Sequence, residues 1–296
     1  MPDDLMFYIV DVFAENPLEG NQLAVFLDAG HLSKKEMQKI AKEMNFSETT
    51  FILSREESKG GYDVRIFTPE TEVPFAGHPT LGTAFIIQRE IIKKPSDQIF
   101  LNLKIGQIPV TPIYENYGVR FLWMKQKSPE FYGSFNHIQM ARAFSLKEEN
   151  MDSRFPVQEV STGIPFVIVP LRTLDSMRSA AFNQEYFLET FKDTATMAFC
   201  LFCPETYEEK NDLNVRVFAH AYGVPEDPAT GSANGCLAGY LVEHRYFDSD
   251  RIDIRTEQGY EIGRPSLLFL RAESEKDRIV VHVGGKVLAV AEGKLL

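Results

Sequence analysis

The stretch Val64-Arg65-Ile66-Phe67, followed after five residues by Val73-Pro74, decides the fold, because the chain repeats it. The second copy is Val215-Arg216-Val217-Phe218, followed after five residues by Val224-Pro225, at a shift of 151 positions (215 − 64). Self-similarity at one fixed period predicts two copies of one structural unit. In a duplicated protein of this kind we expect the functional site where the two copies meet.

Each Val-Pro pair precedes a predicted helix that begins with small residues. The first copy reads Phe-Ala-Gly-His-Pro-Thr over 75–80, and the second reads Glu-Asp-Pro-Ala-Thr-Gly-Ser over 226–232. Proline is favoured at the first helical position, which predicts helices from Pro79 into Glu90 and from Pro228 to about His244. Because helix N-termini attract anions, two such starts facing one another would hold a carboxylate without arginine or metal.

The remaining pattern predicts an α+β protein. A capping box of Ser33 and Glu36 opens a helix over 34–44. Gly284-Gly285 signals a hairpin turn. Strands are predicted at 7–13, 23–26, 49–53, 62–67, 99–104, 108–113, 119–123, 267–270, 279–283 and 287–290. Those at 99–123 could enclose the first helix of small residues.

Composition narrows the class of partner. The 296 residues are 44% hydrophobic and 25% charged, with a net charge of −11, which disfavours nucleic acid and favours a small molecule. The N-terminal apolar run reaches only from Met6 to Val10, so we expect no signal peptide, no membrane span and a cytoplasmic protein. Three cysteines fit a reducing compartment.

Glu48 and His78 are candidates for proton transfer. Glu48 lies at the mouth of an apolar strand, where it is either a solvated turn residue or a general base whose pKa partial burial raises. His78 precedes Pro79 at the first helix start, as a cap or as a group that binds substrate and moves a proton near neutral pH.

The second helix start offers Asp227 and Thr230-Gly231-Ser232. Asp227, the partner of Ala76 at the 151-residue shift, is either a helix N-cap or a cap that also faces a ligand. The other three residues supply amides and two hydroxyls, or simply close packing. Gly77 and Gly231 would let a ligand approach the backbone.

Other constellations are weaker. Cys200 and Cys203 form a lone C-x-x-C in an apolar strand, where alternation points the thiols to opposite faces, so we predict neither a zinc nor a redox site. The six histidines show no metal-binding spacing, and no metal is predicted. The residues around Ser232 lack the order of a serine hydrolase motif, so a hydrolase is the weakest alternative.

The chain resembles the PhzF-like, phenazine-biosynthesis isomerase family over nearly its whole length. The segments that match, in family order, are Asp11–Phe13, Pro17–Asn21, Asn45–Thr49, Ile66–Pro69, Glu72–Thr80 and Glu226–Ala233. The resemblance implies the diaminopimelate-epimerase fold: two pseudo-symmetric halves, each a β-barrel-like sheet around a central helix. The expected halves are 1–118 with 287–296, and 119–286, with the active site in the cleft between them.

The resemblance also implies roles. Glu48 of the Ser-Glu-Thr motif is expected to transfer the proton, and Gly77, His78 and Asp227 are expected to surround the substrate. Beside what the resemblance implies, we predict that Ser47, Thr230, Gly231 and Ser232 also bind substrate. The best characterised family reaction isomerises trans-2,3-dihydro-3-hydroxyanthranilate by moving a proton from C3. One positioned carboxylate suffices for this, with no cofactor. A homodimer is expected from the resemblance alone.

Two alternatives limit this prediction. Epimerases of this fold use one cysteine at each central-helix start, where this chain has Ala76 and Asp227-Pro228, so two-thiol chemistry is disfavoured. The chain could also be a metabolite-binding or protein-interaction member without turnover. Glu48, His78 and Asp227 together favour the enzyme, because binding alone requires no proton-transfer carboxylate.

Overall fold

The computed structural model describes residues 5–116, 118–191, 198–220 and 224–296, which form two compact units. Unit 1 comprises residues 1–125 and 284–296, and unit 2 comprises residues 126–283. The first boundary falls after Lys125 rather than after Gly118, because the strand that begins at Gly118 pairs with its predecessor in unit 1.

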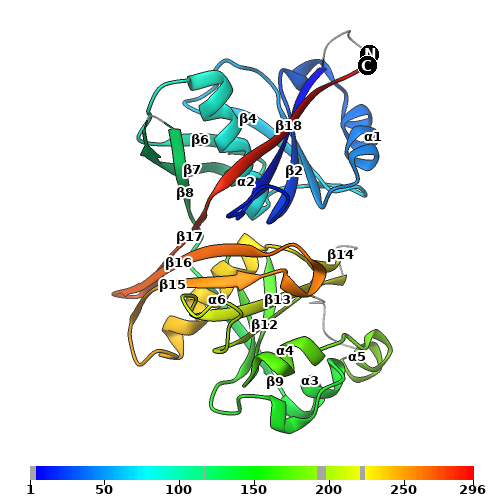
Figure 1. Cartoon of the computed structure of the whole chain (residues 1–296), viewed down its shortest axis with the longest axis vertical. Helices are drawn as coiled ribbons and strands as arrows, with labels where there is room; N and C mark the ends of the chain where they lie inside the picture. The colour runs from blue at the N-terminus through cyan, green and yellow to red at the C-terminus, as the bar shows by residue number, and fades with distance from the viewer. Residues whose placement is uncertain (1–4, 117, 192–197, 221–223) are drawn as a thin grey trace. The chain divides into compact units, whose positions relative to one another are not determined.

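Unit 1 is a strongly connected sheet with one enclosed helix. Its elements are β1 (Leu5–Val12), β2 (Asn21–Phe26), α1 (Lys34–Met44), β3 (Glu48–Ile52), β4 (Tyr62–Phe67), β5 (Glu72–Val73), α2 (Gly77–Ile86), β6 (Ile99–Leu103), β7 (Gly106–Glu115), β8 (Gly118–Lys125) and β18 (Val287–Leu295), with a short 3-10 turn at Ala29–His31 and a π-helical segment at Ile87–Ile92 that continues α2. The red strand β18 runs antiparallel along β1, so both ends of the described chain lie side by side (Figure 1).

Unit 2 has its own sheet and its own enclosed helix. Its elements are β9 (Glu130–Phe135), α3 (His137–Ala143), β10 (Val157–Ser161), β11 (Pro165–Pro170), α4 (Leu174–Ser179), α5 (Gln184–Thr190), β12 (Phe199–Cys203), β13 (Leu213–Ala219), β14 (Val224–Asp227), α6 (Gly231–Glu243), β15 (Arg251–Gln258), β16 (Ser266–Glu275) and β17 (Arg278–Gly285), with 3-10 turns at Glu148–Asn150 and Tyr260–Ile262. The last two residues of β17 belong to unit 1.

The two units repeat one order of strand pairings, which confirms the predicted duplication. In unit 1, β2 pairs parallel with β3, β3 antiparallel with β4, and β4 both antiparallel with β5 and parallel with β6. In unit 2, β11, β12, β13, β14 and β15 take the same places in the same senses. The predicted α+β fold of two pseudo-symmetric halves is therefore confirmed.

The central helices are buried nearly all round. Every residue of α2 except Phe85, and every residue of α6 except Glu243, is buried. Small residues make this possible, since a Cβ added at Gly82 would lie 2.6 Å from Leu23 Cδ2 and 2.9 Å from Val12 Cγ2. The prediction that the strands over 99–123 could enclose the first helix is confirmed, because α2 contacts β6, β7 and β8 as well as β1, β2 and β3. In unit 2, α6 contacts β15 and β16 (Figure 1).

The strand register corrects the correspondence between the copies. Ile66 pairs with Val73 in unit 1, whereas the equivalent Val217 pairs with Asp227, so the spacing grows from seven positions to ten. From this point the shift is 154 rather than 151. Glu72-Val73-Pro74 corresponds to Glu226-Asp227-Pro228, and the second Val-Pro at 224–225 has no equivalent role.

The arginine of the repeated motif anchors the strand that leads to each central helix. Arg65 makes a bidentate ion pair with Glu72, and Arg216 makes one with Glu226. Each guanidinium also lies over the ring two residues later, Phe67 at 5.1 Å and Phe218 at 4.9 Å. The repeated Val-Arg-x-Phe is thus explained by the clamp that its arginine forms.

Several element boundaries differ from those predicted. The helix over 34–44 and its capping box are confirmed. The central helices begin at Gly77 and Gly231 rather than at Pro79 and Pro228. Pro79 lies within the first turn of α2, and Pro228 lies three residues before α6. The strand β11, in the less patterned part of unit 2, was not predicted.

The hairpin turn predicted from Gly284-Gly285 is wrong. Both glycines lie within β17, and neither has a positive φ. A Cβ at Gly284 would approach Phe121 Cε1 to 2.5 Å and Trp123 Cε3 to 2.6 Å, so glycine here permits a close approach of strand to side chains. Among the described residues, no helix is long and apolar enough to span a membrane.

Candidate functional site

Glu48 opens β3, where the parallel pairing with β2 places it opposite Leu23. Its side chain is 19% exposed, so it is neither the fully solvated turn residue of one interpretation nor a sealed core carboxylate. The preceding Ser47 is half-buried. A carboxyl group at this depth keeps access to a ligand while part of its surroundings is protein.

His78 is the second residue of α2, and its side chain contacts Glu48. The imidazole Nε2 lies 3.4 Å from the Glu48 Oε2 atom, and the His78 side chain is only 5% exposed. Burial lowers the pKa of the His78 imidazole to about 3, and a hydrogen bond from the ring to the Gln22 carbonyl acts in the opposite direction. The ring is therefore neutral at physiological pH.

This neutral ring gives the pair a defined chemistry. Nε2 makes no hydrogen bond of its own, so the ring donates to the Gln22 carbonyl through Nδ1, the nitrogen that carries the hydrogen. The Nε2 lone pair then faces a carboxyl oxygen, and two lone pairs attract one another only through an intervening proton. The Glu48–His78 pair can hold one such proton and give or take it at the carboxyl group.

Asp227 ends β14 and is not the N-cap of α6. The N-cap is Thr230, whose own side chain makes no capping bond to the helix backbone and instead donates from Oγ1 to the Asp227 carboxylate Oδ2. The N-cap interpretation of Asp227 is wrong because unit 2 has three more residues than unit 1 between the paired positions of its two strands. Asp227 therefore corresponds to Val73, and the N-cap position falls three residues later, at Thr230. Asp227 remains buried, at 7% exposure.

The other predicted residues occupy equivalent places at the two helix starts. Gly77 and Gly231 are each the first helical residue, and Ser232 takes the place that His78 takes in unit 1. The counterpart of Ala76 is Thr230 and not Asp227. Neither Ala76 nor Thr230 is a cysteine, so with the corrected register the two helix starts still lack the thiols that two-thiol chemistry needs.

The structure brings together Glu48 with His78 in unit 1, and Asp227 with Thr230 in unit 2. That the Glu48–His78 pair and the Asp227–Thr230 pair lie close to one another stays a prediction. Sequence reasoning missed Gln258 and Asn234, whose amides bond to Thr230. Only the position of Asn234, four residues after Thr230 on the helix, could have signalled a contact.

The three cysteines are buried and free. Cys203 belongs to the apolar cluster around Phe144, whereas Cys200 interacts with Cys236 of α6, so the predicted opposite orientation of the two thiols is confirmed. Burial raises the pKa of the Cys203 and Cys236 thiols to about 12. In the described part of the chain, no group of His, Cys, Asp and Glu side chains has an arrangement that could hold a metal ion.

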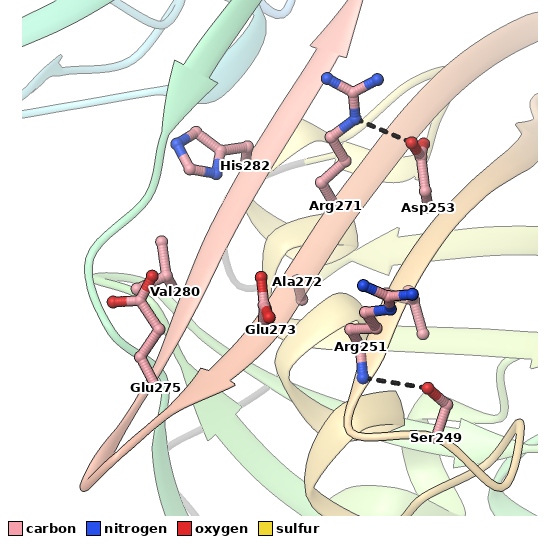
Figure 2. Close-up of a pocket in the computed structure, with 10 residues that line it drawn as sticks. Ser249, Arg251, Asp253, Arg271, Ala272, Glu273, Glu275, Val280 and His282 are labelled. Atoms are coloured by element: carbon pink, nitrogen blue, oxygen red, sulfur yellow. Dashed lines mark hydrogen bonds and ion pairs between the residues drawn. The ribbon is translucent and has the colours of Figure 1, made fainter.

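A separate concave surface lies on β15, β16 and β17 (Figure 2). Its rim carries both charges, and Arg271 forms an ion pair with Asp253 at 3.0 Å (Figure 2). None of the predicted site residues lines it. The mixed charge selects no class of ligand.

Known proteins resemble this chain over its full length. The family model described as phenazine biosynthesis-like protein, PhzC-PhzF, matches residues 10–293. The trans-2,3-dihydro-3-hydroxyanthranilate isomerase of Pseudomonas aeruginosa is 38% identical over 289 residues, which cover 97% of this chain and 98% of that protein.

Solved structures agree with this similarity. The Bacillus anthracis phenazine biosynthesis protein of the PhzF family matches with a TM-score of 0.90 and 28% identity, over 99% of both chains. A hydroxyproline epimerase from Agrobacterium vitis matches with a TM-score of 0.65 at 8% identity, over 99% of this chain and 91% of that one, which shows the shared epimerase-like fold. The chain therefore belongs to the phenazine biosynthesis-like, PhzC-PhzF family and is an isomerase of that family.

Proposed function

We propose that this isomerase moves a proton on a small carboxylated substrate without a cofactor, with Glu48 as the general acid and base. The observation that carries the proposal is the contact between Glu48 Oε2 and the neutral, buried His78 ring at 3.4 Å. A carboxyl group that shares a proton with one neighbour can take a proton from carbon and return it elsewhere on the same molecule.

His78 supports this role by orientation and by charge. Because the ring is anchored to the Gln22 carbonyl at the start of a buried helix, it cannot turn away from Glu48 without losing that bond. Because it stays neutral, it does not form a fixed ion pair that would hold Glu48 permanently ionised. A carboxyl group that both takes and gives a proton needs a neighbour that holds it in place without fixing it in one protonation state.

The helix starts support the proposed substrate class. Gly77 and Gly231 place backbone amides at the positive ends of α2 and α6, which favours a carboxylate in the substrate. Asp227 would hydrogen-bond its amino or hydroxyl groups, and His78, whose Nδ1 and Nε2 face Gln22 and Glu48, would act on the substrate through Glu48. Trans-2,3-dihydro-3-hydroxyanthranilate, the substrate in the name of the Pseudomonas aeruginosa relative, carries all three groups and is the first compound to test.

The test is deuterium uptake. The protein is incubated in D₂O with trans-2,3-dihydro-3-hydroxyanthranilate and a panel of small amino and hydroxy acids, and uptake is followed by NMR and mass spectrometry. E48Q should lower the exchange rate by about 10²- to 10⁴-fold, the usual contribution of a general acid–base group. E43Q, which changes an exposed glutamate on α1, is the matched control.

Uptake that survives E48Q removes Glu48 from this role. If no compound takes up deuterium with the wild-type protein, the chain is better explained as a metabolite-binding member of the family. A homodimer is part of the same proposal, and light scattering of the purified protein tests it directly.

A further inference from the structure

We propose that Gln258 is a positioning residue that, acting through Thr230, fixes Asp227 as an ionised hydrogen-bond acceptor in the site. The inference rests on the proposed function in one respect, namely that Asp227 contacts the substrate. It concerns a residue for which the sequence offers no motif. Gln258 ends β15 and is completely buried.

Backbone groups settle which way the Gln258 amide points. Its Nε2 lies 2.7 Å from the Asp227 carbonyl oxygen, which can only accept, and the Thr230 N–H, which can only donate, lies 3.2 Å from its Oε1. Exchanging the amide oxygen and nitrogen would therefore break both bonds. The orientation of Gln258 is fixed at both ends.

Asn234 is fixed in the same way and reinforces that orientation. Its Nδ2 donates to the Thr230 carbonyl at 3.1 Å and to Gln258 Oε1 at 3.0 Å. Its Oδ1 accepts from the Thr256 hydroxyl at 2.7 Å. Asn234, Gln258 and Thr256 are all inaccessible to solvent, so bulk water does not compete for these bonds.

The direction of the Thr230 hydroxyl follows from these two amides. The second hydrogen of Gln258 Nε2 points at Thr230 Oγ1, 3.1 Å away, so this oxygen acts as an acceptor toward Gln258. Its single hydrogen is then directed to Asp227 Oδ2. A carboxylate oxygen that accepts this hydrogen needs no proton of its own, and the bond is charge-assisted.

This arrangement assigns different tasks to two residues predicted to bind substrate. Thr230 already directs its hydroxyl hydrogen to Asp227, so it supports the site rather than donating to a substrate carboxylate. Asp227, held as an acceptor, selects a substrate group that donates, such as an ammonium or a hydroxyl. The carboxylate of the substrate is left to the backbone amides at the helix starts.

The isosteric Q258E variant tests the assignment. It replaces Nε2 by an oxygen and removes both donated hydrogens without changing the size of the side chain. With trans-2,3-dihydro-3-hydroxyanthranilate as the probe, kcat/KM at neutral pH should fall about 10- to 100-fold, as expected for lost hydrogen bonds that support a charged group. The deficit relative to wild type should shrink as pH falls and the introduced carboxyl gains a proton with which it can donate.

The matched control is Q88E. Gln88 is also buried and also donates from Nε2 to a backbone carbonyl, that of Lys94 at 2.8 Å, but it belongs to the π-helical segment of unit 1. Its replacement imposes the same chemical change in a buried setting. A deficit with the same acid recovery in Q88E would overturn the assignment, because the effect would then be a general loss of stability.

Substitutions of Thr230 alone cover the case in which Q258E folds poorly. T230V removes the hydroxyl at constant shape, and T230S keeps it. The chain of bonds predicts that T230S, which keeps the hydroxyl, loses less activity than T230V. Where Q258E folds, T230V should lose about as much as Q258E, and a double-mutant cycle should show that the two losses do not add. Additive losses, or equal loss in T230S and T230V, would overturn it.

A readout without substrate separates this inference from the proposed function. In the wild-type protein, the Thr230 hydroxyl hydrogen should give a slowly exchanging NMR resonance, identified by its loss in T230V. Q258E should shift or remove it at neutral pH and restore it on acidification. An unchanged resonance in Q258E, or none in wild type, refutes the positioning role, whereas expected spectra without turnover of any compound refute only the proposed function.

Discussion

Each of the three thiols is enclosed by protein, which gives the first prediction at the residue scale. Cys200, Cys203 and Cys236 are buried, and burial holds the thiol pKa of Cys203 and Cys236 near 12, so no thiolate is available at neutral pH. The native protein should resist a thiol-specific disulfide reagent and react with it at all three cysteines only after unfolding. Rapid reaction of the native protein would reopen the question of thiol catalysis.

Single residues also show what sequence could and could not predict. Glu48 and His78 were both identified as candidates, but their 3.4 Å contact depends on how α2 packs beside β3, which no spacing in the sequence encodes. Asp227 was identified as a candidate, but the prediction that it caps the helix was wrong, because the matching Val-Pro at 224–225 concealed a change of strand register. Gln258 was missed because a buried amide has no motif and acquires its role from the backbone groups around it.

At the scale of elements, the central helix of unit 1 depends on the absence of a side chain at Gly82. Alanine there would place a methyl group 2.6 Å from Leu23 Cδ2, so G82A should cost about 1–3 kcal/mol of unfolding free energy, as overpacked cores do. Denaturant unfolding measures this. G133A, where an added Cβ meets nothing within 4 Å, should unfold like wild type.

The clamp between β4 and β5 makes the stability of unit 1 depend on pH. Arg65 is the main cause that lowers the pKa of Glu72 to about 2, with help from Lys104 at 2.7 Å; Lys34 lies 3.4 Å away. Because the folded pKa is depressed from 4.5, the stabilisation is complete above about pH 4.5 and is lost as pH falls toward 2. The full shift corresponds to about 3 kcal/mol.

Unfolding of wild type and E72Q at several pH values tests this clamp. E72Q should be less stable at neutral pH and should lose less stability on acidification, whereas E70Q, at an exposed carboxylate two residues away, should follow wild type. Parallel pH curves for wild type and E72Q would show that the ion pair contributes nothing. The sequence revealed the repeated arginine but not this clamp, since each glutamate partner becomes visible only in the strand register.

For the whole molecule, the pairing of β18 with β1 makes unit 1 discontinuous in sequence. A chain that ends at Lys286 would leave one edge of β1 unpaired along Leu5–Val12, while its other edge keeps the pairing with β2. Hydrogen exchange should then accelerate throughout unit 1, while residues 126–283 keep the protection of the full-length protein. Equal loss of protection in both units would mean that they do not fold independently.

The same pairing sets an order of events during synthesis on the ribosome. Unit 2 is one continuous segment and can fold as soon as it has emerged, whereas residues 5–125, which precede it, must wait for β18, which follows it, before their sheet is complete. The N-terminal half therefore spends most of translation with an unpaired strand edge, the surface that chaperones shield and that nascent chains otherwise use to aggregate. Of the two units, the one whose synthesis begins earlier is, by this geometry, the one that matures later.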